Sequence, residues 1–286
     1  MNLRSRVFLV VVVLAAIYIP FQFWVDTSFR TSLDDDSLRG YLTRPEKPRH
    51  IQHALVQLTQ RIQEDRGTAE PFYEDALRLV EHKESAIRSM LAWVLGFDNT
   101  HQPFQDGLQK LLQDEHPNVR YNAALSLVKF GDTSIRPVLL EMLRPFRVGS
   151  GVDGKVREIF ASNRPVRSGV QLALVVAADG KESGVPSPLD GRIRRVFCRS
   201  GDKVNRGDDL VEILPGEMQV WEALKALYLI GRPEDLPEVR RWTVPVPPYS
   251  KKIQIQAQQT ALTLENRSKS SGTSEKTENP STDQNP

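Results

Sequence analysis

Apolar residues recur every three or four positions between residues 118 and 131, which places them on one face of an α-helix. The apolar positions are Val119, Ala123, Leu127 and Phe130. Pro117 at the start of this segment and Gly131 just past its end match the usual asymmetry of helix termini. The pattern therefore predicts a helix over residues 118–131, and the next apolar segment predicts a second helix over residues 135–143.

The same arrangement of residues recurs elsewhere in the chain. About 32 residues earlier, the matches to Val119, Arg120, Ala123, Ala124 and Leu127 are Ile87, Arg88, Leu91, Ala92 and Leu95. About 100 residues later, the matching residues are Ala223, Leu224, Leu227 and Gly231, and a fainter fourth copy consists of Ile253, Ala257 and Ala261. Repeated helix pairs with a period in the thirties indicate an α-solenoid.

The pattern of a Val-Arg pair followed by Ala-Ala, Leu and Gly resembles the HEAT repeat family. The resemblance covers roughly residues 50–145 and 216–267. Asp114 and Glu115 precede the best copy and are candidate helix caps. Arrays of this family usually offer an elongated surface to a protein partner, so the resemblance implies a binding role.

The interval between copies changes across residues 148–215. The step grows from about 32 to about 100 residues, and the excess matches the length of this segment. Its short runs alternate apolar and polar residues, which predicts half-buried strands, and Asp-Gly pairs supply turns. We therefore predict a β-module inserted between the two helices of one repeat, since insertions are tolerated where the inserted ends lie close together.

The β-module repeats its own sequence. Residues 148–160 align with residues 185–197, and Val166, Gly169 and Leu172 then align with Val204, Gly207 and Leu210. The segments VPSPLDG (185–191) and GDKVNRGDDL (201–210) resemble the biotinyl/lipoyl family. That resemblance implies a barrel-sandwich domain over about residues 147–215, with two halves related by a pseudo-twofold axis. In the first half, residues 163–166 replace the G-D-x-V turn of the family.

Carriers of this family attach lipoate or biotin to a lysine at the tip of the hairpin that joins the halves. Here the tip spans residues 177–184, Gly180 stands at the usual lysine position, and Lys181 comes one residue late. The flanking Met pair of biotin carriers and the D-K-A frame of lipoyl carriers are absent. Attachment of lipoate or biotin at Lys181 is therefore an alternative, and the main prediction includes no cofactor.

The same fold without the lysine occurs in periplasmic adaptor proteins of efflux and secretion assemblies, which also have one N-terminal anchor helix. In those adaptors a helical hairpin splits the lipoyl halves, whereas a short loop joins them here. The resemblance implies a second alternative, a component of an export or efflux assembly.

The N-terminus predicts a membrane anchor. Arg4 and Arg6 precede an uncharged run over residues 7–19, which residues 20–25 extend to about the length that spans a bilayer. The positive charges predict a cytoplasmic N-terminus. No small-x-small site follows the run, which favours an uncleaved anchor over a cleaved signal peptide. We therefore predict a single-pass protein of the inner membrane whose C-terminal domains are periplasmic or otherwise extracytoplasmic.

Composition narrows the classes of function. The chain has 38 Lys and Arg against 36 Asp and Glu, and the basic residues form no stripe, so no nucleic-acid partner is expected. Its single cysteine, Cys198, excludes an internal disulfide and a cysteine-based zinc site. No phosphate-binding loop, catalytic triad spacing or carboxylate pair stands out, so we predict neither an enzyme nor a metal site.

Together these patterns predict an α+β multidomain chain. Its predicted parts are a transmembrane anchor (1–25), a linker (26–48), HEAT-like repeats (49–146), a lipoyl-like β domain (147–215), further HEAT-like repeats (216–267) and a disordered tail (268–286). The predicted function is a membrane-anchored scaffold that binds protein partners and is capable of self-association. The candidate partner-binding residues lie in two loops: Asp179, Gly180, Lys181, Glu182, Ser200, Gly201, Asp202 and Lys203.

Overall fold

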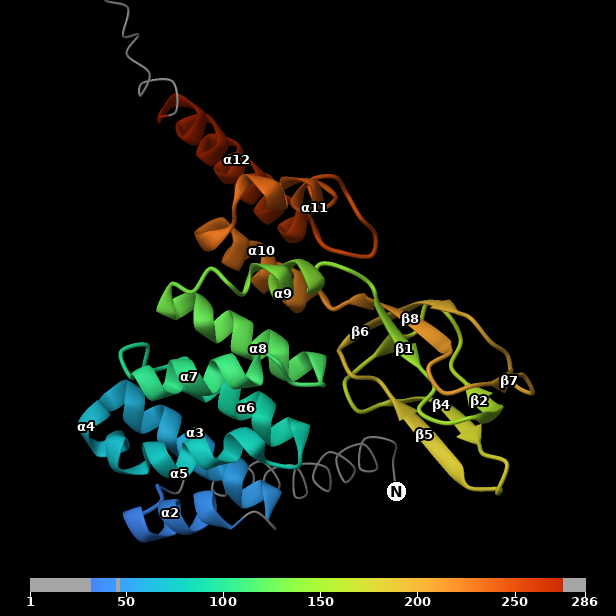
Figure 1. Ribbon diagram of the computed structural model, residues 1–286, viewed down its shortest axis with the longest axis horizontal. Coiled ribbons are helices and arrows are strands. Elements are labelled where there is room, and N and C mark those ends of the chain that lie inside the picture. The colour runs from blue at the N-terminus through green and yellow to red at the C-terminus, as the bar shows by residue number, and fades with distance from the viewer. Residues whose placement is uncertain (1–31, 45–46, 275–286) are drawn as a thin grey trace, which may run out of the picture. The chain divides into compact units, whose positions relative to one another are not determined.

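The computed structural model describes residues 32–44 and 47–274 (Figure 1). These residues form two compact units that divide between His82 and Lys83. Helices dominate both units, and eight short strands lie within the second unit. The structure thus shows an α+β chain with a helical part and a β-sheet region.

The first unit is a small helical cluster. Its elements are α2 (Asp35–Thr43), α3 (Pro48–Glu64), α4 (Arg66–Ala69), η1 (Glu70–Phe72), α5 (Tyr73–Leu77) and η2 (Arg78–Glu81). Asp34 caps α2 by accepting a hydrogen bond from the backbone amide of Ser37 at 2.8 Å. The sequence predicts a polar linker over residues 26–48, but α2 lies inside this range as a packed helix because Leu38 and Leu42 are buried.

The predicted localisation as a single-pass membrane protein is corrected by the structure. Among the residues it describes, no helix is both long enough and apolar enough to cross a bilayer. The longest of these helices, α12 (Lys251–Ser274), has the length but is rich in Gln, Thr and Ser. The segment on which the prediction depends, residues 1–25, lies outside the described residues.

The second unit contains consecutive helix pairs. Its helical elements are α6 (Ser85–Leu95), α7 (Gln102–Leu111), α8 (Pro117–Leu127), η3 (Val128–Phe130), α9 (Arg136–Glu141), α10 (Glu217–Ile230), η4 (Pro233–Asp235), α11 (Leu236–Arg240) and α12. The helix predicted over residues 118–131 is α8 with the following η3 turn. Pro117 is its first residue, and Gly131 ends it with a φ of 72°, a left-handed conformation that glycine adopts without strain.

The C-terminal helix extends beyond the predicted repeats. Ile253, Ala257 and Ala261, the faint fourth copy, are all buried in α12. The sequence predicts a disordered tail over residues 268–286, but α12 continues to Ser274. Residues 275–286 of that predicted tail lie outside the described residues.

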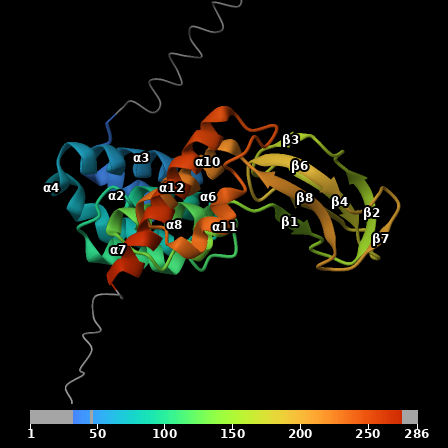
Figure 2. The same ribbon diagram turned by 90° about the horizontal axis from the view of Figure 1, so that it is seen from above.

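The β-sheet region lies to one side of helices α6–α12 in both views (Figures 1 and 2). Its strands are β1 (Phe146–Gly149), β2 (Gly154–Ile159), β3 (Pro165–Val166), β4 (Gln171–Val176), β5 (Glu182–Pro186), β6 (Gly191–Val196), β7 (Lys203–Val204) and β8 (Asp209–Pro215). They form two four-stranded antiparallel sheets, β1-β8-β6-β3 and β5-β4-β2-β7. These described strands form no closed barrel. The structure therefore shows the predicted β-sheet region, but not the full barrel-sandwich fold that the sequence predicts.

The two sheets have equivalent strand orders. Exchanging β1–β4 with β5–β8 converts one order into the other, so the internal sequence repeat corresponds to two equivalent structural halves. The turn before β3 illustrates this equivalence. Asn163 has a φ of 64°, and its counterpart Gly201 has a φ of 97°. Asparagine tolerates this left-handed conformation better than most residues. The first half of the β region therefore forms the same turn although it lacks the G-D-x-V sequence.

The two ends of the β region lie side by side, because β1 pairs with β8 and Phe146 faces Ile213. Contacts also join the helices that precede and follow the region. Gln219 of α10 donates to the carbonyl of Met142 at 2.9 Å. Arg136 of α9 makes two hydrogen bonds, of 2.9 and 2.7 Å, to the carboxylate of Asp235. This geometry supports the interpretation of the β region as an insertion within the helical array.

Candidate functional site

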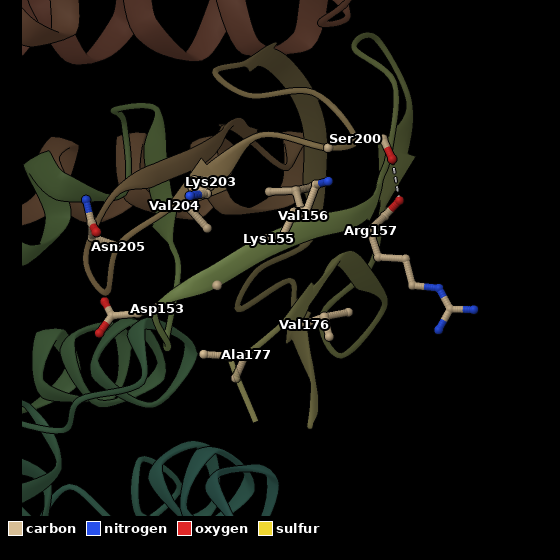
Figure 3. A pocket seen from close by; sticks show the side chains of 13 residues that line it. Asp153, Lys155, Val156, Arg157, Val176, Ala177, Ser200, Lys203, Val204 and Asn205 are labelled. Atoms are coloured by element: carbon tan, nitrogen blue, oxygen red, sulfur yellow. Dashed lines mark hydrogen bonds between the residues drawn. The ribbon is translucent and has the colours of Figure 1, made fainter. Parts of the chain in front are cut away.

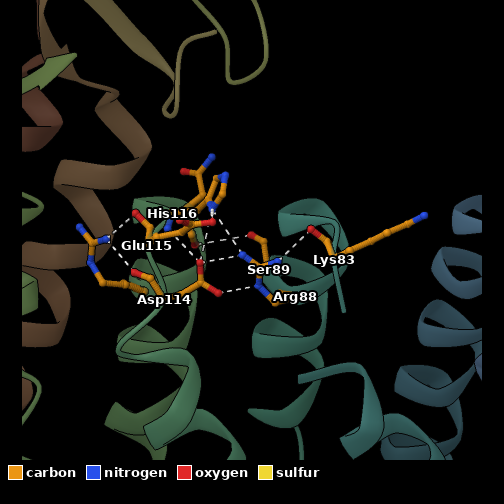
Figure 4. A network of polar contacts seen from close by, with 8 residues as sticks. Lys83, Arg88, Ser89, Asp114, Glu115 and His116 are labelled. Atoms are coloured by element: carbon orange, nitrogen blue, oxygen red, sulfur yellow. Dashed lines mark hydrogen bonds and ion pairs between the residues drawn. The ribbon is translucent and has the colours of Figure 1, made fainter. Parts of the chain in front are cut away.

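An arginine near the start of α6 and another near the start of α8 make similar polar contacts with the loop before each helix. Arg88 of α6 donates to both carboxylate oxygens of Asp114, at 2.5 and 2.9 Å (Figure 4). Arg120 of α8 donates to Glu141 at 2.6 Å. Each arginine also donates to the backbone carbonyl five residues before it. The Val-Arg and Ile-Arg pairs recognised in the sequence therefore occupy equivalent places in successive repeats.

Asp114 belongs to this contact and does not cap α8 as the sequence predicts. Neither Asp114 nor Glu115 is the N-cap residue, which is His116, and no side chain caps this helix. Burial raises the pKa of Asp114, but hydrogen bonds from Arg88 and from the backbone amide of His116 outweigh that effect. The pKa of this carboxyl therefore lies below its ordinary value. The Asp114 carboxylate is engaged in the ion pair with Arg88 and does not cap α8.

A groove of about 760 Å³ runs along α6, α8 and α10. Its lining includes Trp93, Tyr121, Leu125, Met218 and Leu229. Trp93 is 46% exposed, Met218 66% and Leu229 61%, although all three are large apolar side chains. Exposed apolar residues that gather in one place mark an interaction surface more reliably than scattered ones. The groove is therefore the strongest candidate site in the helical part of the chain.

Hydrogen bonds between neighbouring helices hold the base of the groove. Asn122 of α8 donates to the carbonyl and hydroxyl oxygens of Ser89, and Ser126 donates to the carbonyl of Ala92 at 2.7 Å. A Cβ atom at Gly96 would overlap the side chain of Ser126, so the close approach of the helices depends on this glycine. The base of the groove is thus formed before any partner binds.

Tyr121 lines the groove with its hydroxyl bound to Glu141 at 3.0 Å. Burial, reinforced by the Glu141 carboxylate, raises the pKa of the Tyr121 hydroxyl well above its ordinary value. Tyr121 is therefore a neutral hydrogen-bond donor at physiological pH, which suits packing and not proton transfer.

The β region borders one end of the groove. Asp190 and Gly216 belong to its lining. Asn118 of α8 donates to the hydroxyl of Ser168 at 2.9 Å, and the amide of Ser168 donates to Asp190 at 2.8 Å. Residues of the β region thus form part of the groove wall.

The two predicted partner-binding loops lie near a second hollow, of about 750 Å³ (Figure 3). Of the predicted residues, those that line it are Ser200, Gly201 and Lys203. The other predicted residues, Asp179, Gly180, Lys181, Glu182 and Asp202, do not line it. Ala177 and Ala178, which precede the predicted partner-binding residues in the same hairpin tip, do. The hollow therefore involves both loops but only some of the predicted side chains.

The hairpin between β4 and β5 places Lys181 beside the tip. Gly180 has a φ of 82°, and the exposed Lys181 follows it. The amide of Lys181 donates to the Asp179 carboxylate at 2.9 Å. Glu182 forms an ion pair with Arg157. The residue at the turn position itself is thus the glycine, in agreement with the offset of the lysine in the sequence.

The remaining reactive groups have structural surroundings. Within residues 32–44 and 47–274, no group of three or more His, Cys, Asp or Glu side chains could hold a metal ion. Cys198 packs against the core of the β region. Burial, with a smaller contribution from Asp202, raises the pKa of its thiol, so a reactive thiolate is disfavoured.

Comparison with known proteins supports the prediction of HEAT-like helical repeats in part of the chain. Residues 73–147 match the family model for HEAT repeats. HEAT repeats are generally protein-interaction modules, and the match confirms the predicted helical repeat in this part of the chain. No curated protein matches the sequence.

A solved structure described as a single-chain, multi-domain long-chain acyl-CoA carboxylase is similar to part of the chain. The identity is 17%, and the similarity covers 43% of this chain and 15% of that chain, with a TM-score of 0.24. A likeness at this level supports no conclusion about function.

Proposed function

We propose that this protein is a non-catalytic scaffold that binds an amphipathic helix of a protein partner in the groove along α6, α8 and α10. The main support is the exposure of Trp93, Met218 and Leu229, which come from two different helices and line one groove. HEAT repeats over residues 73–147 agree with an interaction role.

The shape and charges of the groove favour a helical occupant. Helices of several successive repeats form its walls, and such a channel accepts an apolar helix face with anchors at positions i, i+3, i+4 and i+7. Its rim has both signs of charge: Glu222 and Lys225 lie 3.4 Å apart, and Lys129 lies over the ring of Phe97. A partner helix with an apolar stripe and mixed charges on its flanks fits these features.

The β region adds a second contact surface in this proposal. Its equivalent halves agree with a lipoyl-like, barrel-sandwich module. Gly180 occupies the turn position where carriers of that family have their lysine, so the proposal gives the module a binding role and not a carrier role. Its contact surface consists of the loops Asp179–Glu182 and Ser200–Lys203.

The experiment compares binding by three forms of the whole protein. Partners are captured from the native host, identified, purified and titrated against wild type, the Trp93→Ala/Met218→Ala variant and a control. The control is Leu262→Ala, because Leu262 is 60% exposed on α12 and lies outside the groove. We expect the groove variant to bind at least about tenfold more weakly, since buried apolar anchors dominate binding energy. Equal affinities for the groove variant and the control would refute the proposal.

A further inference from the structure

The hollow in the β region has an apolar floor and cationic walls. It lies on the sheet β5-β4-β2-β7 and is lined by β2, by the start of the β4–β5 turn, and by the turn that leads into β7 (Figure 3). Val176, Ala177 and Ala178 give it an apolar lining, whereas the neighbouring Val156 and Val204 are buried in the core of the β region. The cationic side chains at the centre are Lys155 and Lys203, whereas Arg157 extends away from the other lining side chains.

The two lysines face one another across a strand pair. In the pairing of β2 with β7, Lys155 is directly opposite Lys203. Like charges in this relation destabilise a sheet. Among the described residues, no carboxylate lies within ion-pair distance of either lysine. Asp153 also lines the hollow, but its carboxylate accepts the backbone amide of Arg206 at 2.6 Å.

The other half of the β region shows that the fold does not require this pair. By the equivalence of the halves, Arg192 replaces Lys155 and Pro165 replaces Lys203, and these two residues are again paired across strands. Arg192 donates to the carbonyl of Asn163 at 2.6 Å. A single cation, hydrogen-bonded to a backbone carbonyl, thus suffices in the half without the hollow, and the two facing lysines need another explanation.

The walls of the hollow are preformed. The amide of Gly201 donates to the carbonyl of Val156 at 2.7 Å, and the amide of Val156 donates to the carbonyl of Asp202 at 2.9 Å. Ser200 donates from its hydroxyl to the carbonyl of Arg157. These bonds hold the turn before β7 against β2, so a ligand would meet the lysines without a loop having to order first.

We infer that this hollow binds an extended acidic peptide segment of a protein partner, whose carboxylates pair with Lys155 and Lys203 and whose apolar side chains pack against Val176 and Ala177. Charge complementarity selects an anionic ligand. The position of β7 at the edge of its sheet selects an extended peptide, because an edge strand offers backbone hydrogen-bonding groups to an added strand. This inference rests on the proposed role of the β region as a contact surface.

The test uses the whole protein and a fluorescein-labelled octapeptide of alternating Glu and Val, followed by fluorescence anisotropy. The peptide supplies both kinds of side chain that the inference requires, carboxylates for the lysines and apolar groups for the lining. The variant is Lys155→Gln/Lys203→Gln. Its matched control is Arg192→Gln, from the equivalent position in the other half. A peptide of alternating Gln and Val tests the need for charge.

The inference predicts that the Glu-Val peptide binds wild type and the Arg192→Gln control equally, that the double lysine variant binds roughly tenfold more weakly, and that added salt weakens binding. It is overturned if no binding occurs, if the Gln-Val peptide binds as well, or if the lysine variant is unaffected. Competition by millimolar inorganic phosphate that depends on both lysines would also overturn it, in favour of a small-anion site. Loss of peptide binding in Trp93→Ala/Met218→Ala would place the peptide in the helical groove, overturning this inference while supporting the proposed function.

Discussion

The ion pair between Arg136 and Asp235 offers a direct test of how the helical array continues across the β region. The two residues are 99 positions apart in the chain, on opposite sides of the strands. The side chain of Asp235 is 2% exposed and that of Arg136 16%. The Asp235 carboxylate also accepts the backbone amide of Arg232 at 2.8 Å. We predict that Asp235→Ala strongly destabilises the second unit, because it leaves a largely buried guanidinium without its main partner.

The size of the effect follows from burial. Breaking a buried ion pair by removing one partner costs about 3–5 kcal/mol. Glu234 remains within 3.5 Å of Arg136, but its side chain is 73% exposed and such a pair contributes about 0–1 kcal/mol. The expected loss is therefore about 3 kcal/mol. With a urea slope of about 1–3 kcal/mol/M, the unfolding midpoint should fall by about 1–3 M.

The assay is urea unfolding followed by far-UV circular dichroism and by tryptophan fluorescence, since Trp242 is buried against Tyr249 close to the affected turn. Glu234→Ala is the matched control and should shift the midpoint little. In the Arg136→Met/Asp235→Leu variant no charge is left buried alone, so most of the lost stability should return. Equal midpoints for Asp235→Ala and Glu234→Ala would show that the Arg136–Asp235 ion pair does not stabilise the contact between the helices before and after the β region.

Two further substitutions test local features of the fold. The pKa of Asp114 is below its ordinary value, so its ionised form stabilises the protein above a pH of about 4, and that stabilisation is lost as pH falls through the folded pKa. Asp114→Asn should therefore reduce the unfolding free energy at neutral pH and flatten its acid dependence, and an unchanged pH profile would contradict the assignment. At Gly154 a Cβ atom would overlap the carbonyl oxygen of Val176, so Gly154→Ala should lower stability by about 1–3 kcal/mol in thermal unfolding. Gly151→Ala, which faces open space, should change it by less than about 0.5 kcal/mol, and similar losses in both variants would refute the steric account.

Much of the helical part could be predicted because local signals agree with one another there. Pro117 and Gly131 mark both ends of α8, and the apolar period between them matches its buried face. The second half of the β region was predictable for the same reason, since its glycines mark turns where φ is positive, as at Gly201 and Gly207.

Other features depend on contacts that no local pattern reveals. Asp114 has the position of a helix cap, but Arg88, which lies 26 residues away in sequence, determines its role. Similarly, the acidic and polar segment before residue 48 contains α2 because Leu38 and Leu42 find a buried site in the first unit. A sequence shows that such residues are polar or apolar, and only the fold shows which partner they meet.

The candidate sites were the least predictable part. The groove residue Trp93 lies on the face of α6 opposite to its buried stripe, so the periodicity that identified the helix excluded it from consideration. In the β region the sequence identified the two loops, but the facing of Lys155 and Lys203 depends on the register of β2 against β7. That register is set by strand pairing between the two halves, which alternation within either strand does not specify.

The equivalence of the two halves connects the groove with the hollow. Gly154 begins β2 and Gly191 begins β6, and a Cβ atom at either would overlap a carbonyl oxygen of the neighbouring strand, Val176 or Leu214 respectively. Gly191 packs against β8, and from the end of β8 the chain continues through Gly216 into α10. Residues at that end of the β region line the helical groove. Gly154 packs against β4, and from the end of β4 the chain turns back into β5 as a hairpin, so that no described helix covers the hollow there. The β region thus borders the groove with one of two equivalent ends, and the other end presents the facing lysines that we infer to bind an acidic segment.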